Sequence, residues 1–257
     1  MNDAALLLPK LSRLRLSGIL ENLDARLEQA VRDKWSFSQF LHMLFDDEIA
    51  RREQRQLGLR LTKSGLDPVK TLETFDFSFN ARIHEPAIRQ LATGDFLNRK
   101  DCVFLLGPSG VGKSHLAQGL GHSACRKGYD VMFRRTYSLL KWIRAGFGDG
   151  SYEKRLQTVV KIPLLILDDF GLKPLSEDSQ SDLYEIICER YEKVPTIITS
   201  NRDMGEWITI FTNPLMGAAA MDRLVHRAIR IVIEGKSYRM ENFVRKSKSL
   251  TTEAPEN

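Results

Sequence analysis

Cysteine is scarce in this 257-residue chain, and its three cysteines form no pattern. Cys102, Cys125 and Cys188 show no CxxC spacing, and an odd number cannot all pair. Each lies in an apolar or helical stretch, so we expect reduced thiols in a core. The lack of metal-ligand spacing argues against a cysteine-bound metal, and reduced thiols indicate a cytoplasmic protein.

Long apolar runs and a large charge excess are also missing. No run of about 18 apolar residues occurs, and residues 1–10 lack the long apolar core of a signal peptide. We therefore expect neither membrane association nor export. Lys and Arg number 38 against 33 Asp and Glu, and this net charge of +5 shows only that the surface could bind an anion. With 42% hydrophobic residues, the chain can bury one substantial core with an appendage.

A glycine-rich turn stands out near the middle of the chain. Residues 102–106 (CVFLL) are typical of a buried strand, and Lys113 and Ser114 open a helical stretch after the turn. Gly107 and Gly112 permit a tight backbone whose N–H groups cradle phosphate oxygens. Lys113 would reach the β- and γ-phosphates, and Ser114 would ligate Mg²⁺. This strand, loop and helix predict a nucleotide site.

Strands and helices alternate after this motif. We predict helices beginning near Lys113, Thr136, Asp178 and Pro214. The predicted strands are residues 102–106, 130–134, 164–168, 196–200 and 229–233. Short apolar strands with crossover helices are typical of a parallel α/β sheet, which binds ligands at the carboxyl ends of its strands.

Polar side chains end two of these strands. Asp168 and Asp169 follow an apolar run, and buried carboxylates are costly unless a cation or polarised water meets them. Asp168 fits a magnesium-side role through Ser114, and Asp169 fits the base that orients the attacking water; both could instead cap a turn. Asn201 ends the strand that we place between the two motif strands, where it contacts that water or serves as a turn residue.

Residues 1–67 form a helical unit by their pattern. Apolar residues recur at helical spacing from Leu7 to about Ala30, and a second helix starts at Ser36, with Gln39 completing a capping box. Its buried face is predicted to use Phe37, Phe40, Leu41 and Leu44. The unit is either a bundle that packs on the main domain or a partner-docking module whose arginine-rich end meets nucleic-acid phosphates. Linker aromatics at residues 75–79 must be covered; they dock on the core or cover an adenine.

Four segments resemble the AAA+ ATPases: 107–115 (GPSGVGKSH), 167–171 (LDDFG), 198–201 (ITSN) and 221–227 (MDRLVHR). Together with residues 70–77 and 237–239, they are most similar to the IstB-type transposition helpers, relatives of the DnaC helicase loaders. The resemblance implies an AAA+ P-loop NTPase fold with a five-stranded parallel sheet flanked by helices, a small all-helical N-terminal domain and no C-terminal lid. It assigns ATP binding to Gly107, Pro108, Ser109, Gly110, Val111, Gly112, Lys113, Ser114 and His115.

The resemblance also implies a shared active site. Arg223 occupies the arginine-finger position, with Arg227 as the alternative, and would touch the γ-phosphate held by a neighbouring subunit. Because such a finger acts on another subunit, the resemblance also implies ATP-dependent homo-oligomerisation and Mg²⁺-dependent ATP hydrolysis. Two departures stand out: Asp169 replaces the more usual glutamate, which could slow turnover, and few residues remain for a lid, so Arg239 could stand in for its sensor arginine.

Basic residues near the second strand predict DNA contact. In related initiators and loaders this region tracks the DNA backbone, and here Tyr137 and Trp142 lie among the cations; a solvated amphipathic helix is the alternative. The predicted DNA-contact residues are Arg134, Arg135, Lys141, Arg144, Lys154 and Arg155.

We interpret the chain as an ATP-dependent, DNA-binding regulator of transposition that assembles on duplex DNA and recruits or stimulates a transposase. The alternatives are a replicative helicase loader and an ATP-gated scaffold with negligible turnover. The predicted division is a docking domain at 1–67, a linker and start of the core at 68–100, the ATPase domain at 101–246 and a disordered tail at 247–257.

Overall fold

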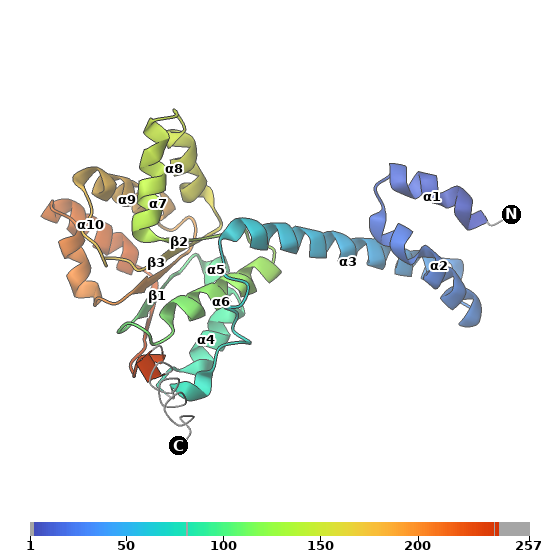
Figure 1. Cartoon of the computed structure of the whole chain (residues 1–257), viewed down its shortest axis with the longest axis horizontal. Coiled ribbons are helices and arrows are strands. Elements are labelled where there is room, and N and C mark those ends of the chain that lie inside the picture. The colour runs from blue at the N-terminus through green and yellow to red at the C-terminus, as the bar shows by residue number, and fades with distance from the viewer. Residues whose placement is uncertain (1–2, 81, 239, 242–257) are drawn as a thin grey trace, which may run out of the picture. The chain divides into compact units, whose positions relative to one another are not determined.

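The computed structural model describes residues 3–80, 82–238, 240 and 241. The chain divides into two compact units, Met1–Leu59 and Arg60–Asn257, and each is described by itself. Figure 1 shows the helices of the first unit and the sheet of the second. The predicted tail at 247–257 and Arg239 lie outside the described residues.

The first unit is built from α1 (Asp3–Arg13), α2 (Ser17–Arg32) and most of α3 (Phe37–Ser64). The prediction of one helix over residues 7–30 was wrong. The helix ends at Arg13, and Arg15 adopts a left-handed φ of 58°, which reverses the chain before α2. A small core of Ile19, Leu23 and Leu44 holds α2 against α3.

The capping box at the start of α3 is confirmed. The Gln39 N–H donates to the Ser36 hydroxyl at 3.2 Å, and the Ser36 N–H donates to the Gln39 side chain at 2.9 Å. The predicted buried face is only half right. Phe40 and Leu44 pack toward α2, whereas Phe37 is 93% exposed and Leu41 is also exposed, because α2 covers a single row of α3.

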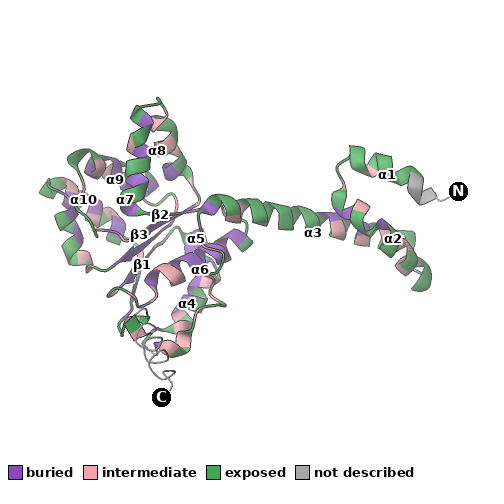
Figure 2. Ribbon diagram, in the orientation of Figure 1, coloured by how far each residue is buried: buried purple, intermediate pink, exposed green. Residues whose placement is uncertain are grey.

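The second unit contains a parallel five-stranded sheet, as predicted. Its strands are β1 (Cys102–Leu106), β2 (Val131–Arg135), β3 (Leu164–Asp168), β4 (Thr196–Ser200) and β5 (Ala228–Val232). The order is β2-β3-β4-β1-β5, so β4 does lie between the two motif strands. The central strands β3, β4 and β1 are buried along most of their length, whereas the outer strands β2 and β5 are partly exposed (Figure 2).

Helices cover both faces of the sheet (Figure 1). One face carries α6 (Lys113–Arg126), with α4 (Glu85–Ala92) and α5 (Asp95–Arg99) beside it. The other carries α7 (Thr136–Arg144), α8 (Tyr152–Lys161), α9 (Glu177–Arg190) and α10 (Pro214–Val225). Three short 3₁₀ segments, η1 (Phe77–Phe79), η2 (Ala145–Phe147) and η3 (Met204–Ile210), join these elements. The sequence analysis did not identify α4, α5 or α8.

Aromatic side chains pack η3 against the middle of β1 and against the segment that follows β3. Trp207 is fully buried, with ring centroids 5.1 Å from Phe104 and 4.7 Å from Phe170. Its indole N–H donates to the Ser200 hydroxyl at 3.1 Å. The buried indole therefore has a polar partner at the carboxyl end of β4.

The last turn of α3 belongs to the second unit, so the observed division falls eight residues before the predicted one. Arg60 pairs with Asp130 at 3.5 Å, and Leu66 is buried against Gly121 on α6. All three cysteines are free thiols, and burial raises the pKa of Cys125 to about 11. Within the described part of the chain, no helix is long and apolar enough to cross a membrane.

Candidate nucleotide-binding site

The loop between β1 and α6 has the conformation that its glycines predict. Gly107 has a φ of 145°, and a Cβ there would lie 2.0 Å from the Ile233 carbonyl oxygen. Gly112 has a φ of 100° and lies under the ring of Phe75. No other residue type fits either position. Lys113 Nζ donates to the Pro108 carbonyl at 2.7 Å, so the lysine lies across the loop.

A hydroxyl on each side meets the buried carboxylate that ends β3. Asp168 is 4% exposed, and its Oδ1 accepts a hydrogen bond from Ser114 at 2.6 Å and one from Thr199 at 2.5 Å. Leu167 pairs with Ile198 in the sheet, so Asp168 and Thr199 follow on adjacent strands. The tertiary fold thus joins the glycine loop, β3 and β4 at one carboxylate.

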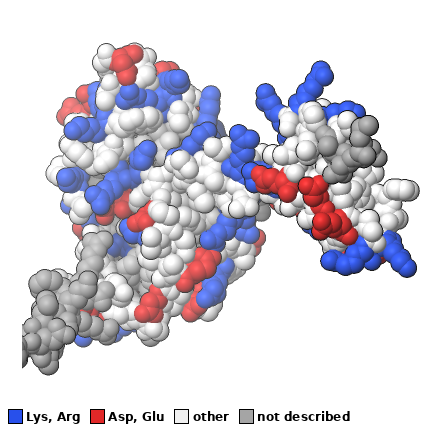
Figure 3. Space-filling model, turned by 45° about the vertical axis from the view of Figure 1, so that its right-hand side comes forward, with Lys and Arg blue, Asp and Glu red and all other residues white. Residues whose placement is uncertain are grey.

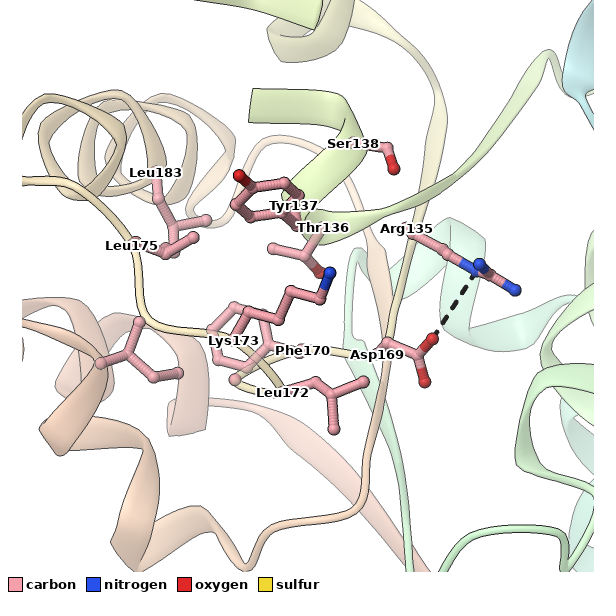
Figure 4. Close-up of a pocket in the computed structure, with 12 residues that line it drawn as sticks. Arg135, Thr136, Tyr137, Ser138, Asp169, Phe170, Leu172, Lys173, Leu175 and Leu183 are labelled. Carbon is pink, nitrogen blue, oxygen red and sulfur yellow. Dashed lines mark ion pairs between the residues drawn. The ribbon is translucent and has the colours of Figure 1, made fainter. Parts of the chain in front are cut away.

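Asp169 continues β3 in a strained conformation. Its φ is 56°, which is uncommon for a residue with a Cβ, and its N–H donates to the Thr199 hydroxyl at 3.1 Å. Thr199 therefore contacts both aspartates. An Asp169 carboxylate oxygen lies 3.7 Å from the guanidinium of Arg135 at the end of β2, and Figure 4 shows this ion pair at the mouth of a cavity of about 130 Å³.

A cavity of about 350 Å³ lies along the carboxyl ends of β1, β3 and β4. It brings together most of the predicted nucleotide residues: Ser109, Gly110, Gly112, Lys113, Ser114, His115, Asp168, Asp169 and Asn201. Sequence reasoning missed four of the other lining residues, Lys70, Gln118, Phe133 and Tyr238, and it assigned the fifth, Arg135, to DNA contact. Only the fold could place Lys70 and Tyr238 there, because they come from segments on either side of the ATPase strands.

His115 contacts the linker as well as the cavity. Its Nε2 lies 2.8 Å from the Thr71 carbonyl and 3.3 Å from the Thr74 hydroxyl, and its ring meets Phe75 edge to face. Burial lowers the pKa of His115, and the nearby positive charge of Lys70 adds to that shift. His115 therefore ties the start of α6 to the linker.

The linker aromatics dock on the core and also form a second cavity. Phe75 packs against Phe77 and His115, and Phe79 meets Tyr238 with ring centroids 4.7 Å apart. A cavity of about 120 Å³ lies among these rings and Val111 of the glycine loop. Both alternatives from the sequence thus remain compatible with this geometry, because docking leaves an apolar space beside the loop.

The two candidate finger arginines lie at the opposite edge of the sheet. Arg223 lies in the last turn of α10, shortly before the amino end of β5, and donates to the Ala219 carbonyl at 2.8 Å. Its guanidinium also lies 5.8 Å from the ring centre of Tyr184. Arg227 lies 3.8 Å from Asp101 at the start of β1. Neither arginine lines the cavity beside Lys113.

The predicted DNA-contact residues differ in their partners. Arg144 pairs with Asp178 at 2.8 Å and Asp182 at 3.2 Å, and Arg155 pairs with Asp149 at 2.7 Å. Arg135 is exposed but pairs with Asp169 and lines the nucleotide cavity. The others are exposed, namely Arg134, Lys141 and Lys154. Figure 3 shows Lys and Arg side chains at the top of the view, near α7 and α8, with acidic side chains among them. DNA contact stays a prediction for all six.

The strand order, the glycine loop and the buried aspartate define an AAA+ P-loop fold. A solved DnaC helicase loader is similar, with a TM-score of 0.51 and 24% identity over 58% of this chain and 86% of that one. So is a replication initiator DnaA bound to AMPPCP and single-stranded DNA, with a TM-score of 0.55 and 22% identity over 73% of this chain and 57% of that one. At sequence identities of 22–24%, the similarity to these two structures shows a shared fold.

The chain belongs to the IstB-like ATP binding protein family, which it matches over residues 9–248. It is 39% identical over 230 residues to an insertion-sequence ATP-binding protein of Mycobacterium tuberculosis, covering 89% of this chain and 92% of that protein. The resemblance of the four motif segments is therefore confirmed at the level of the family.

Proposed function

We propose that the chain is an ATPase that binds Mg²⁺-ATP in the 350 Å³ cavity and assembles on DNA as a regulator of transposition. The observation that carries the proposal is the Asp168 carboxylate, which meets the Ser114 hydroxyl directly beside Lys113. That set matches what a P-loop site needs for a triphosphate and its cation.

The residues present fit Mg²⁺. Asp168 and Ser114 offer oxygen donors already in contact, and Mg²⁺ in nucleotide sites uses one or two protein ligands together with water and phosphates. No cluster of three or more His, Cys, Asp or Glu side chains suited to a metal occurs in the part of the chain that the structure describes. That agrees with a cation shared with substrate. Bound there, Mg²⁺ would neutralise charge on the β- and γ-phosphates.

The protein groups then have distinct tasks. The P-loop N–H groups and Lys113 bind the phosphates, and the apolar cavity beside Val111 accepts the adenine. Asp169 and Asn201 orient the attacking water, and Thr199 holds both aspartates in place. Because Arg223 lies at the other edge of the sheet, it stabilises the transferred phosphoryl group only in the site of another copy.

DNA and partner binding complete the proposal. Exposed cations near α7 contact the DNA backbone through salt-sensitive phosphate contacts, and the N-terminal helices recruit a transposase. The insertion-sequence relative supports the transposition role, and the DnaA complex with single-stranded DNA supports DNA contact by this fold.

The test is DNA co-sedimentation and mass measurement with ATP, ADP and no nucleotide. We expect the protein to form a larger assembly and to bind DNA with ATP, but not with ADP or without nucleotide. A monomer that binds no DNA in all three states would contradict the proposal.

Two other functions have specific support. The DnaC-like fold favours a helicase loader, which would prefer single-stranded DNA and capture a replicative helicase. The short Asp169 side chain, paired with Arg135, favours an ATP-gated scaffold with negligible turnover. Duplex against single-stranded affinity separates the first from our proposal, and steady-state phosphate release with DNA and partner present separates the second.

A further inference from the structure

The segment at residues 65–76, which we call the linker strap, follows α6 closely. The Gln118 side chain accepts a hydrogen bond from the Asp67 N–H at 2.8 Å, and His122 Nε2 lies 2.9 Å from the Asp67 carbonyl. Further along, Leu72 packs onto Gly119, where an added Cβ would lie 2.6 Å from its side chain. The strap thus contacts α6 at several points along the helix.

The far end of the strap reaches the glycine loop. Thr71 contacts His115, and Phe75 covers Gly112. Glu73 pairs with Arg126 at 2.6 Å, and this contact lowers the pKa of Glu73 to about 2. Hydrogen bonds, an ion pair and apolar packing together fix the strap against the helix that follows the P-loop.

Lys70 lies in the middle of the strap and lines the nucleotide cavity. Among the described residues that form this cavity, it is the one that the strap contributes. Its partner within the strap is Asp67, at 3.3 Å, and both side chains are 42% exposed. A half-exposed ion pair of this kind is weak, so the ammonium can exchange it for another anion at little cost.

The charge pattern of the cavity favours a phosphate as that anion. Asp168 and Asp169 line the cavity from the β3 side, where a cation would be held, and three cationic side chains, Lys70, Lys113 and Arg135, also line it. Arg135 pairs with Asp169 at 3.7 Å. A triphosphate in this space meets Lys113 from the loop and Lys70 from the strap. A lysine ammonium is compact and mobile enough to serve as a point charge for phosphate.

We propose that Lys70 is a second phosphate-binding lysine of the nucleotide site, supplied by the linker strap. The inference rests on the proposed ATP binding. A nucleotide held by Lys70 and Lys113 together joins the P-loop to the segment that follows the end of α3 at Ser64. Nucleotide occupancy then stabilises the strap as well as the loop.

The experiment compares Lys70→Gln, Lys70→Arg and the control Lys63→Gln in the full chain. Lys63 is an exposed lysine in the last turn of α3, outside the cavity. Calorimetry measures binding of a non-hydrolysable ATP analogue with Mg²⁺. Hydrogen exchange follows residues 66–76 with and without this analogue, and melting temperatures without nucleotide show that each variant is folded.

We expect Lys70→Gln to weaken binding about five- to tenfold, as for a lost charge-assisted contact to phosphate. Lys70→Arg should recover most of the affinity, and Lys63→Gln should bind like the unaltered chain. The analogue should slow exchange of the strap in the unaltered chain and much less in Lys70→Gln.

Unchanged affinity in Lys70→Gln would overturn the inference while leaving the ATP site intact. Equal losses in Lys70→Gln and Lys70→Arg would also overturn it, because charge would not be the cause. If the unaltered chain failed to bind the analogue, the proposed function itself would fall.

Discussion

The two edges of the parallel sheet differ in what they can do. The carboxyl edge carries the glycine loop, Asp168 and Asn201 around an open cavity. The amino edge carries Arg223 and Arg227. A five-residue strand separates these edges by about 16 Å, which is longer than an arginine side chain. Arg223 and Arg227 therefore lie outside the cavity of their own chain, and in our proposal the finger arginine comes from another copy.

A third arginine at the amino edge, Arg190, has a structural role. Arg190 is 3% exposed and donates hydrogen bonds to the carbonyls of Val159, Val160 and Ile162 at the end of α8, and to that of Pro195. Burial lowers its pKa to about 9. Arg190 therefore satisfies buried backbone, whereas Arg223 is partly exposed and could reach a partner.

The largest effect should come from the carboxyl edge. Lys113→Ala removes the loop cation that meets the phosphates, and we expect ATP affinity to fall about 100-fold or more, with hydrolysis and ATP-dependent assembly lost. Lys127→Ala, just past the far end of the same helix, is the matched control. Calorimetry measures the affinity and mass measurement follows the assembly. Normal ATP-dependent assembly in Lys113→Ala would contradict the assignment of the nucleotide site to the carboxyl edge.

Arg223→Ala tests the amino edge. We expect turnover to fall about 10³-fold, the usual order for a lost arginine finger, while ATP affinity stays within about twofold. Mixing this variant with Lys113→Ala should restore some hydrolysis, because the second variant supplies Arg223 to the intact P-loop of the first. Phosphate release is the measurement. If turnover fell in Arg227→Ala but not in Arg223→Ala, Arg227 would be the finger. Full turnover in both variants would contradict the proposed shared site.

Thr199→Val addresses the contact between the two aspartates. Valine suits a strand but leaves the Asp169 N–H and the Asp168 carboxylate without this hydroxyl. We expect hydrolysis about tenfold slower and the free energy of unfolding lower by about 1–2 kcal/mol. Thr158→Val on α8 is the control for the substitution itself. Turnover equal to that of the unaltered chain would show that Thr199 has no positioning role.

The smallest expected effect is on the pH dependence of stability, through an ion pair of the linker strap. The Arg126 contact lowers the pKa of Glu73 from 4.5 to about 2. Because the folded pKa is depressed, the pair stabilises the fold above about pH 4.5, and this contribution is lost as pH falls toward 2. Both side chains are largely exposed, so solvent screening keeps the contribution below about 1 kcal/mol.

Chemical denaturation of the unaltered chain and Glu73→Gln checks this window. The difference in the free energy of unfolding should be present near neutral pH and shrink in acid. A difference that grows in acid would reverse the assigned sign.

Much of the carboxyl edge could be predicted from the sequence. The glycine spacing of residues 107–112 defines the loop, and the apolar run before Asp168 places that carboxylate at a strand end. The N-terminal helices were harder. Apolar spacing alone did not show the chain reversal at Arg15, because a left-handed residue leaves no mark in hydrophobic periodicity.

The sequence by itself determined the family, the parallel sheet and the loop that binds phosphate, because these depend on local backbone geometry and short spacings. Only the tertiary structure decided which distant groups meet. It brought Thr199 onto both aspartates, His115 onto the strap and Lys70 into the cavity, and it kept Arg223 away from them. Strand order and the path of the linker create these contacts, and neither leaves a local signal along the chain.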